Sequence, residues 1–213
     1  MTAARGKFIS LEGGEGAGKS TLLAGVRDVL ESRGLRVVQT REPGGTPVGE
    51  AVRAIVLDPT TRGLAAETEL LLMFASRAQL VREVIEPSLA AGQWVLSDRY
   101  ADASHAYQGG GRGQPSSRIA ELEQWACAGV KPDLTLLLDL PVATGRARIA
   151  GRGEVDRIES EADAFFERVR AVYRERATLE PQRFRVIDAS QAPAAVLRSA
   201  TEVLTGWLAE AAA

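Results

Sequence analysis

Gly13-Gly14-Glu15-Gly16-Ala17-Gly18-Lys19-Ser20 is the stretch that decides the fold of this 213-residue chain. It fits the pattern G-x-x-x-x-G-K-[ST] and lies between an apolar, strand-like run that starts at Phe8 and a segment of helical period that starts at Lys19. The glycines let the backbone curl so that successive N–H groups point inward, and the following helix adds its positive N-terminal end. This phosphate loop (residues 13–20) therefore predicts a site for the phosphates of a nucleotide.

Short apolar runs alternate with longer segments of helical period on both sides of the phosphate loop. The predicted strands are Phe8 to Glu12, Arg36 to Thr40, Trp94 to Asp98, Leu134 to Asp139 and Phe184 to Asp188. The predicted helices are Lys19 to Ser32, Ala66 to Leu89, Ser117 to Ala128, Glu161 to Leu179 and Ala194 to Ala211. The alternation predicts an α/β fold, a three-layer sandwich of the P-loop NTPase type with helices on both faces of a five-stranded parallel sheet.

Two further segments are predicted to be loops, either with a function or as solvated connections. Gln108 to Gln114 is rich in glycine and contains Arg112, and Ala150 to Glu159 contains arginines and acids between two helical patterns.

The composition limits the class of protein and its partners. The chain is 45% hydrophobic and 25% charged, and its length suits one domain, residues 1–213. Its 26 basic and 28 acidic residues give a net charge of −2, so no general field would attract nucleic acid or an anionic membrane. Cys127 is the single cysteine, which excludes an intrachain disulfide, and no apolar stretch approaches the roughly 20 residues of a membrane span. We expect a cytoplasmic protein that binds neither nucleic acid nor membranes.

Two predicted strands end in an aspartate that could hold Mg²⁺. Asp98 is followed directly by Arg99, and an acid beside an arginine at the carboxyl edge of a parallel sheet places a metal ligand next to a phosphate ligand. Asp139 ends another strand, and its role as a site residue or as a simple strand end stays open. The predicted magnesium ligands are Asp98 and the hydroxyl of Ser20.

A second set of polar residues exceeds what one nucleotide needs. Residues 40–46, Arg53, Arg77, Ser104 and the pair 107–108 lie on segments that should converge at the same edge of the sheet. Guanidinium groups bind phosphate through two parallel hydrogen bonds, so the surplus of arginines indicates a second substrate that carries a phosphate.

Five blocks of the chain, in order, resemble the thymidylate kinase family, whose members transfer the γ-phosphoryl group of ATP to dTMP. The blocks are residues 11–21 (LEGGEGAGKST), 40–46 (TREPGGT), 98–100 (DRY), 104–112 (SHAYQGGGR) and 152–157 (RGEVDR). The second and fourth blocks are the most specific, because the phosphate loop is shared by many unrelated activities. The resemblance spans nearly the whole chain and implies ATP and dTMP as substrates, Mg²⁺ as cofactor and a homodimer.

The same resemblance implies roles for individual residues. The catalytic residues that it implies are Lys19, Arg99, Arg152 and Arg148. The ATP-binding residues are Gly13, Gly14, Glu15, Gly16, Ala17, Gly18, Lys19, Ser20 and Thr21. The dTMP-binding residues are Glu15, Glu42, Arg53, Phe74, Arg77, Arg99, Ser104, Tyr107 and Gln108.

The chain departs from the family pattern at two positions. Some relatives carry an arginine directly after the loop carboxylate, where this chain has Gly16, so the arginine for the transition state is expected in a lid segment at about residues 148–160, with Arg152 as the first candidate. Many relatives place a phenylalanine four residues before the arginine that matches Arg77, where this chain has Met73. Either Phe74 or Met73 would contact thymine; Phe74 is favoured, and a position in the core is its alternative.

Two other functions fit a phosphate loop. A kinase for another nucleotide or for a deoxynucleoside would use the same chemistry on a different acceptor. A nucleotide-controlled regulatory switch would bind one nucleotide and a protein partner, and the surplus of arginines for a second phosphate argues against it.

Overall fold

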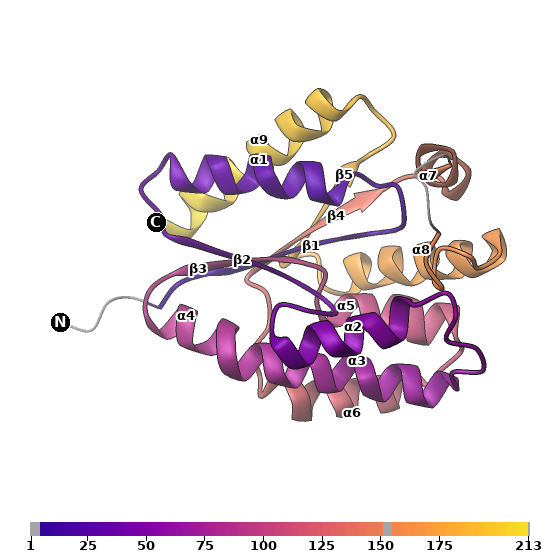
Figure 1. Ribbon diagram of the computed structural model, residues 1–213. Helices are drawn as coiled ribbons and strands as arrows, with labels where there is room; N and C mark the ends of the chain where they lie inside the picture. Colours follow the sequence, from indigo (N-terminus) through magenta and orange to yellow (C-terminus); the bar gives the residue numbers. More distant parts are fainter. Residues whose placement is uncertain (1–4, 151–154, 213) are drawn as a thin grey trace.

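Five parallel strands form one sheet in the order β2-β3-β1-β4-β5 in the computed structural model, which describes residues 5–150 and 155–212 (Figure 1). The strands are β1 (Phe8–Gly13), β2 (Val37–Arg41), β3 (Trp94–Asp98), β4 (Leu134–Asp139) and β5 (Phe184–Asp188). In the register of the central strand, Leu11 lies between Asp98 of β3 and Leu136 of β4. The predicted fold class is confirmed.

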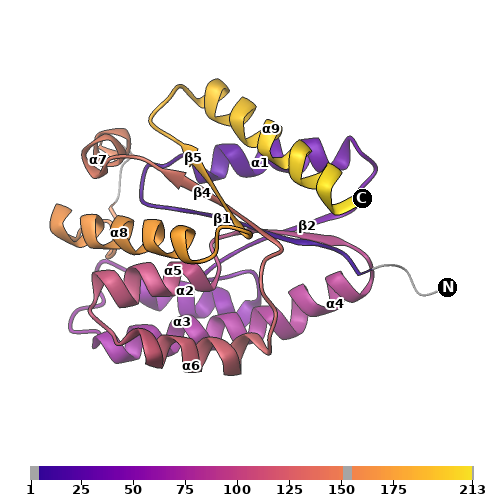
Figure 2. The same ribbon diagram turned by 180° about the vertical axis from the view of Figure 1, so that it is seen from behind.

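Helices cover both faces of the sheet, as Figures 1 and 2 show from opposite sides. The α-helices are α1 (Lys19–Glu31), α2 (Pro47–Leu57), α3 (Ala66–Leu80), α4 (Glu86–Ala90), α5 (Ala101–Ser104), α6 (Ser116–Cys127), α7 (Val142–Ile149), α8 (Asp163–Leu179) and α9 (Pro193–Ala212). Two π-helical segments, η1 (Val81–Ile85) and η2 (His105–Gly111), continue α3 and α5. Helices α1 and α9 form one layer, whereas α2 to α6 and α8 form the other. Within the described ranges, no helix combines the length and the apolar character that a membrane crossing needs.

The two faces of the central strand β1 bury different apolar clusters. Ile9 and Leu11 pack with side chains of α1 and α9, while Phe8 packs with Tyr100 and with side chains of η1 and α4 on the other side. Because β1 is buried on both faces, its carboxyl end is a rigid base for the phosphate loop.

The predicted helix from Ala66 to Leu89 is continuous, but it contains the π-helical turn η1. The N–H of Glu86 donates to the carbonyl oxygen of Val81, five residues earlier. Pro87 follows at the start of α4, and a proline inside a helix clashes with the carbonyl four residues before it. The wider turn at η1 accommodates that ring and lets the helix continue.

The prediction of a loop over Gln108 to Gln114 is wrong for its first half, because η2 extends to Gly111. The glycines there permit close packing and do not mark a flexible turn. A Cβ at Gly111 would lie 2.4 Å from the ring of Phe165, and one at Gly110 would lie 2.8 Å from the backbone oxygen of Arg168. The Arg168 guanidinium donates to the carbonyl oxygens of both glycines, at 3.0 and 2.9 Å, so α8 and η2 are held together.

Candidate active site

The phosphate loop connects β1 to α1 and forms one wall of a polar cavity, the phosphate cavity. Residues 15–21 line it, opposite Arg53, Asp98 and Arg99. Gly13 and Gly14, at the start of the loop, do not line this cavity, and their carbonyl oxygens accept hydrogen bonds from Nζ of Lys19 at 3.1 and 3.0 Å. The structure therefore brings the other predicted ATP-binding residues, 15–21, together around one concave surface.

The ammonium group of Lys19 is buried beside a second cation, so a bound anion would stabilise its charge. Burial lowers the pKa of Lys19, and repulsion by Arg99 lowers it further, against the opposite effect of Glu15 and Asp98. A phosphate group at this place would supply negative charge where two cations, Lys19 and Arg99, face the same cavity.

The residues predicted for magnesium, Ser20 and Asp98, both line the phosphate cavity. Oδ1 of Asp98 is buried and has no hydrogen-bond partner among the described residues. Mg²⁺ commonly takes one or two protein oxygens and completes its octahedron with water and phosphate oxygens. This pair of oxygen donors beside a phosphate site fits that requirement.

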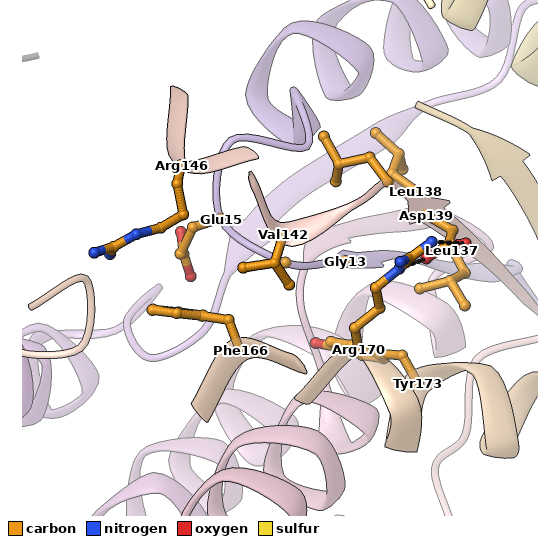
Figure 3. A pocket seen from close by; sticks show the side chains of 12 residues that line it. Gly13, Glu15, Leu137, Leu138, Asp139, Val142, Arg146, Phe166, Arg170 and Tyr173 are labelled. Carbon is orange, nitrogen blue, oxygen red and sulfur yellow. Dashed lines mark hydrogen bonds and ion pairs between the residues drawn. The ribbon is translucent and has the colours of Figure 1, made fainter. Parts of the chain in front are cut away.

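Asp139, the other aspartate at a strand end, is bound by an arginine. Nε and Nη2 of Arg170 donate to its two carboxylate oxygens at 2.7 and 3.0 Å. Figure 3 shows this pair at the rim of a small cavity behind the phosphate loop, beside Tyr173 and Phe166 of α8. Its volume of about 20 Å³ is enough for a water molecule and not for a nucleotide. Asp139 therefore forms an ion pair with Arg170 and does not line the phosphate cavity, which favours a structural role.

Gly16 of the phosphate loop touches the backbone of α7. Its φ is +69°, and a Cβ at Gly16 would lie 2.2 Å from the carbonyl oxygen of Gly145. A Cβ at Gly145 would lie 2.3 Å from the carbonyl oxygen of Glu15. No side chain fits between the loop and α7 unless the backbone of one of them moves.

Arg99 occupies the centre of the site and is held in a left-handed conformation with a φ of +71°. Its backbone N–H donates to the carbonyl oxygen of Leu11 at 2.9 Å. One guanidinium nitrogen donates to the carbonyl oxygen of Gly13 (2.8 Å), and the other donates to Oε1 of Glu15 (2.7 Å). Arg99 therefore ties the phosphate loop to the end of β3, with the guanidinium positioned before a substrate arrives.

Three further side chains complete the surroundings of Arg99. The hydroxyl of Tyr107 accepts from Nη2 of Arg99 at 2.9 Å and donates to Glu15 at 2.7 Å. The hydroxyl of Tyr173 accepts from Nη1 at 3.2 Å and donates to Oε2 of Glu12 at 2.7 Å. Burial alone would raise the pKa of Glu15, but the charges of Arg99 and Lys19 lower it below the ordinary value. Glu15 is thus an ionised acceptor at the mouth of the cavity.

A second, partly apolar cavity, the base cavity, adjoins the phosphate cavity. Val56, Leu57, Met73 and Ile158 give it an apolar wall, and its polar lining includes Arg53, Tyr107 and Gln108. Nη1 of Arg53 donates to the carbonyl oxygen of Pro43 at 3.0 Å, which fixes the arginine at the edge of the cavity. The mixture of an apolar slot and a few polar groups suits a nucleobase with its sugar.

Arg77 is fully buried beneath the base cavity. Its Nε donates to Oε2 of Glu42 at 2.7 Å, Nη1 donates to the hydroxyl of Ser104 at 3.0 Å, and Nη2 donates to the carbonyl oxygen of Tyr100 at 3.2 Å. Burial raises the pKa of Glu42, although Arg77 acts in the opposite direction. These contacts bring three predicted dTMP-binding residues, Glu42, Arg77 and Ser104, into one buried cluster.

Phe74 lies behind this cluster and not in the cavity. Its ring stacks on the guanidinium of Arg77 with 4.5 Å between the ring centre and Cζ, and its side chain is buried among Leu70, Ile119 and Ala126. Met73 lines the base cavity instead. Both residues are on the inner side of α3, so their spacing from Arg77 could not separate the two roles.

The two arginines predicted for the lid have different outcomes. Arg148, at the end of α7, donates to the carbonyl oxygens of Ala189 (2.7 Å) and Ser190 (3.1 Å) in the loop after β5. Its side chain therefore holds this loop and does not line the phosphate cavity. It also lines a hollow with Gly18 and Pro193, next to the phosphate loop. Arg152 lies outside the described residues.

Some residues of the site were not predicted from the sequence. Tyr173 accepts from Arg99 and donates to Glu12, and Ile158 lines the base cavity. Tyr173 lies in a helical pattern typical of core positions, Glu12 directly precedes the phosphate loop, and Ile158 lies between two charged residues. No local signal in the chain indicates these roles.

Comparison with known proteins agrees with this geometry. A family model described as thymidylate kinase matches residues 11–200. The thymidylate kinase of Pseudomonas putida (strain GB-1) is 54% identical over 201 residues, 94% of this chain and 96% of that protein. That of Alkalilimnicola ehrlichii is 53% identical over 209 residues, 96% of each chain. The crystal structure of thymidylate kinase from Ehrlichia chaffeensis matches with a TM-score of 0.78 at 30% identity, over 94% of this chain and 99% of that chain. The chain is therefore a phosphotransferase that belongs to the thymidylate kinase family.

Proposed function

We propose that the chain transfers the γ-phosphoryl group of ATP to dTMP where the phosphate cavity meets the base cavity. One observation carries this proposal: the two cavities share Glu15, Arg53 and Arg99 in their linings. Phosphoryl transfer needs the attacking and leaving oxygens in line across one phosphorus atom, and catalysis consists mainly of positioning and charge stabilisation. Two adjoining cavities position the two substrates, and the arginines at their junction supply the charge stabilisation.

On the ATP side, the backbone N–H groups of the phosphate loop and Lys19 bind the phosphates. Ser20 and Asp98 would hold Mg²⁺, which neutralises phosphate charge when it is bound. The hollow beside Gly18, walled by Arg148 and Pro193, has the place expected for the adenine ring. Arg148 then serves ATP binding more than catalysis.

On the acceptor side, Arg53 and Arg99 hold the phosphate of dTMP, and Glu15 accepts a hydrogen bond from the 3′-hydroxyl. Tyr107 lies where a ribose 2′-hydroxyl would have to fit, which favours deoxyribose. Gln108 meets the edge of the base from the lining of the base cavity. Arg77 and Ser104 are fully buried beneath that cavity, and Arg77 supports Glu42, which lines it. The attacking phosphate oxygen is already anionic at neutral pH, so no general base is required.

The whole chain, residues 1–213, acts as one kinase domain in this proposal, with a lid segment at about 148–160 that brings Arg152 to the transferred group. We also propose that the protein is a homodimer in the cytoplasm. Exposed apolar side chains on neighbouring helices of one layer, Ile55 on α2, Leu71 on α3 and Trp125 on α6, support the dimer.

The experiment that tests the function is ADP formation from ATP and Mg²⁺ with dTMP, dUMP, dCMP, dAMP, dGMP and thymidine offered separately. We expect dTMP to give the highest kcat/KM. Preference for another acceptor would establish a kinase of different specificity. Folded protein that binds ATP but forms no ADP with any acceptor would overturn the proposal in favour of a regulatory switch.

A further inference from the structure

Glu69 on α3 is a buried carboxylate that the proposed mechanism does not use. Its side chain is 1% exposed and accepts hydrogen bonds from three other segments of the chain. Nε2 of Gln108 donates to it at 2.9 Å, Nε of Arg112 at 3.2 Å, and Nη2 of Arg157 at 2.6 Å. One of these donors, Gln108, lines the base cavity.

Glu69 is ionised at neutral pH and can only accept. Burial alone would raise its pKa, but hydrogen bonds from Gln108 and Arg157 and the charges of Arg112 and Arg157 lower it below the ordinary value. A carboxylate without a proton has no hydrogen to donate. The amide of Gln108 must therefore present its NH₂ group to Glu69.

The other end of the Gln108 amide is then fixed as well. Its Oε1 is buried and has no hydrogen-bond partner among the described residues. A buried carbonyl oxygen without a partner costs free energy unless a ligand supplies an N–H. Because Gln108 lines the base cavity, a base bound there can bring an N–H group to this oxygen.

This acceptor distinguishes classes of pyrimidine. Thymine and uracil carry a hydrogen on the ring nitrogen N3, whereas cytosine has a lone pair there. A base with N3–H would satisfy Oε1 of Gln108, but cytosine would place two acceptors against each other. Sites built around such a hydrogen bond reject the analogue that lacks it more strongly than apolar pockets reject a missing methyl group.

We propose that Glu69 is a positioning residue for base specificity: by holding the Gln108 amide in one orientation, it selects acceptor nucleotides whose ring offers an N–H. This inference rests on the proposed function, in which the base of dTMP meets Gln108. Glu69 itself touches no substrate.

The test compares Glu69→Gln with the unaltered enzyme in binding dTMP, dUMP and dCMP, each measured by calorimetry as a Kd. The introduced amide can donate as well as accept, so Gln108 is free to turn. We expect the Kd values of dTMP and dUMP to rise together by about tenfold, the scale of one hydrogen bond, while that of dCMP stays constant or falls. The KM for ATP should not change.

Two controls separate this role from a structural one. Glu161 also pairs with Arg112 but does not contact Gln108, so Glu161→Gln should leave the ratio of the dCMP and dTMP Kd values unchanged. In a Gln108→Met background, Glu69→Gln should have no further effect on that ratio, because the amide that Glu69 orients is gone.

Equal weakening of all three nucleotides by Glu69→Gln, or an unchanged ratio in folded protein, would overturn the proposal. If this variant does not fold, Glu69→Asp keeps the charge that Arg112 and Arg157 require but withdraws it from Gln108, and the same loss of discrimination is expected. A wild-type enzyme that does not phosphorylate dTMP would instead refute the proposed function, so the two failures can be told apart.

Discussion

At the scale of single residues, the contact between Gly16 and Gly145 limits what the phosphate loop can contribute to the transition state. A side chain at Gly16 would meet the backbone of α7 at 2.2 Å, so the phosphate loop has no room for an arginine there. We predict that Arg152→Ala lowers kcat by 10³-fold or more, with a much smaller change in the KM for dTMP, in steady-state kinetics. Adding Gly16→Arg to this variant should not restore turnover. Near-normal kcat in Arg152→Ala would remove the lid arginine from catalysis.

Glu12 gives the stability of the protein a particular dependence on pH. Burial and the neighbouring Asp102 raise its pKa from 4.5 to about 8, against Arg99 and the hydrogen bonds from Tyr173 and the Tyr100 N–H. Between these pH values the folded protein keeps a proton that the unfolded chain has released. The free energy of unfolding therefore decreases as pH rises from about 4.5 to 8, by up to about 1.4 kcal/mol per pH unit, and this contribution levels off above pH 8.

Replacing the titrating group tests this directly. Glu12→Gln should make the free energy of unfolding less dependent on pH in the same window. The stability of the variant should therefore rise relative to that of the wild type as pH increases from 5 to 8. Urea denaturation at pH 5, 6.5 and 8 measures the difference. A difference that is constant across these pH values would show that Glu12 is ionised throughout.

At the scale of elements, the packing of η2 against α8 sets the back wall of the site. We predict that Gly111→Ala destabilises the protein by about 1–3 kcal/mol, because the new methyl group would overlap the ring of Phe165. Gly206→Ala is the matched control: apart from the adjoining backbone of α9, no atom lies within 4 Å of a Cβ there, and alanine inside α9 should stabilise by about 0.5–1 kcal/mol. Guanidinium denaturation of both variants measures these changes in the free energy of unfolding. Equal changes in the two variants would contradict the packing role of Gly111.

The same elements show which parts of the fold the sequence could predict. All five strands were predictable as short runs of strand length, and the inner strands β1, β3 and β4 are the most apolar because they lie between two other strands and are largely buried. Helix α2 was missed although Thr46 caps it by accepting from the N–H of Gly49 at 3.0 Å and Pro47 begins it. Those residues also read as part of a polar loop, and the local pattern cannot choose between the two.

The residues of the site also differ in whether the sequence could predict them. The phosphate loop, Asp98 and Arg99 are close in sequence to strand ends and were predictable from motifs. Tyr173 reaches Arg99 from 74 residues away, and Glu69 reaches Gln108 from 39 residues away, so their roles depend on tertiary contacts that no short pattern contains.

At the scale of the whole molecule, the apolar side chains left on the layer of α2 to α6 bear on assembly. Trp125 is 82% exposed and Leu71 is 56% exposed, on helices that pack against each other. We predict a dimer in light scattering coupled to gel filtration, and Trp125→Glu combined with Leu71→Glu should shift it to a monomer. Leu179→Glu, at an equally exposed position at the end of α8, should leave the dimer intact. A monomeric wild type would refute this assembly.

The contact between two glycines also has a consequence for how such enzymes diverge. A lineage cannot move its catalytic cation from the lid to the phosphate loop by one substitution, because the position of Gly16 admits a side chain only after α7 has shifted away from Gly145. Intermediates on that route would lack either the cation or the packing. Homologues with a side chain at the position of Gly16 should therefore also differ at the position of Gly145, as a correlated pair that can be sought in any set of related sequences.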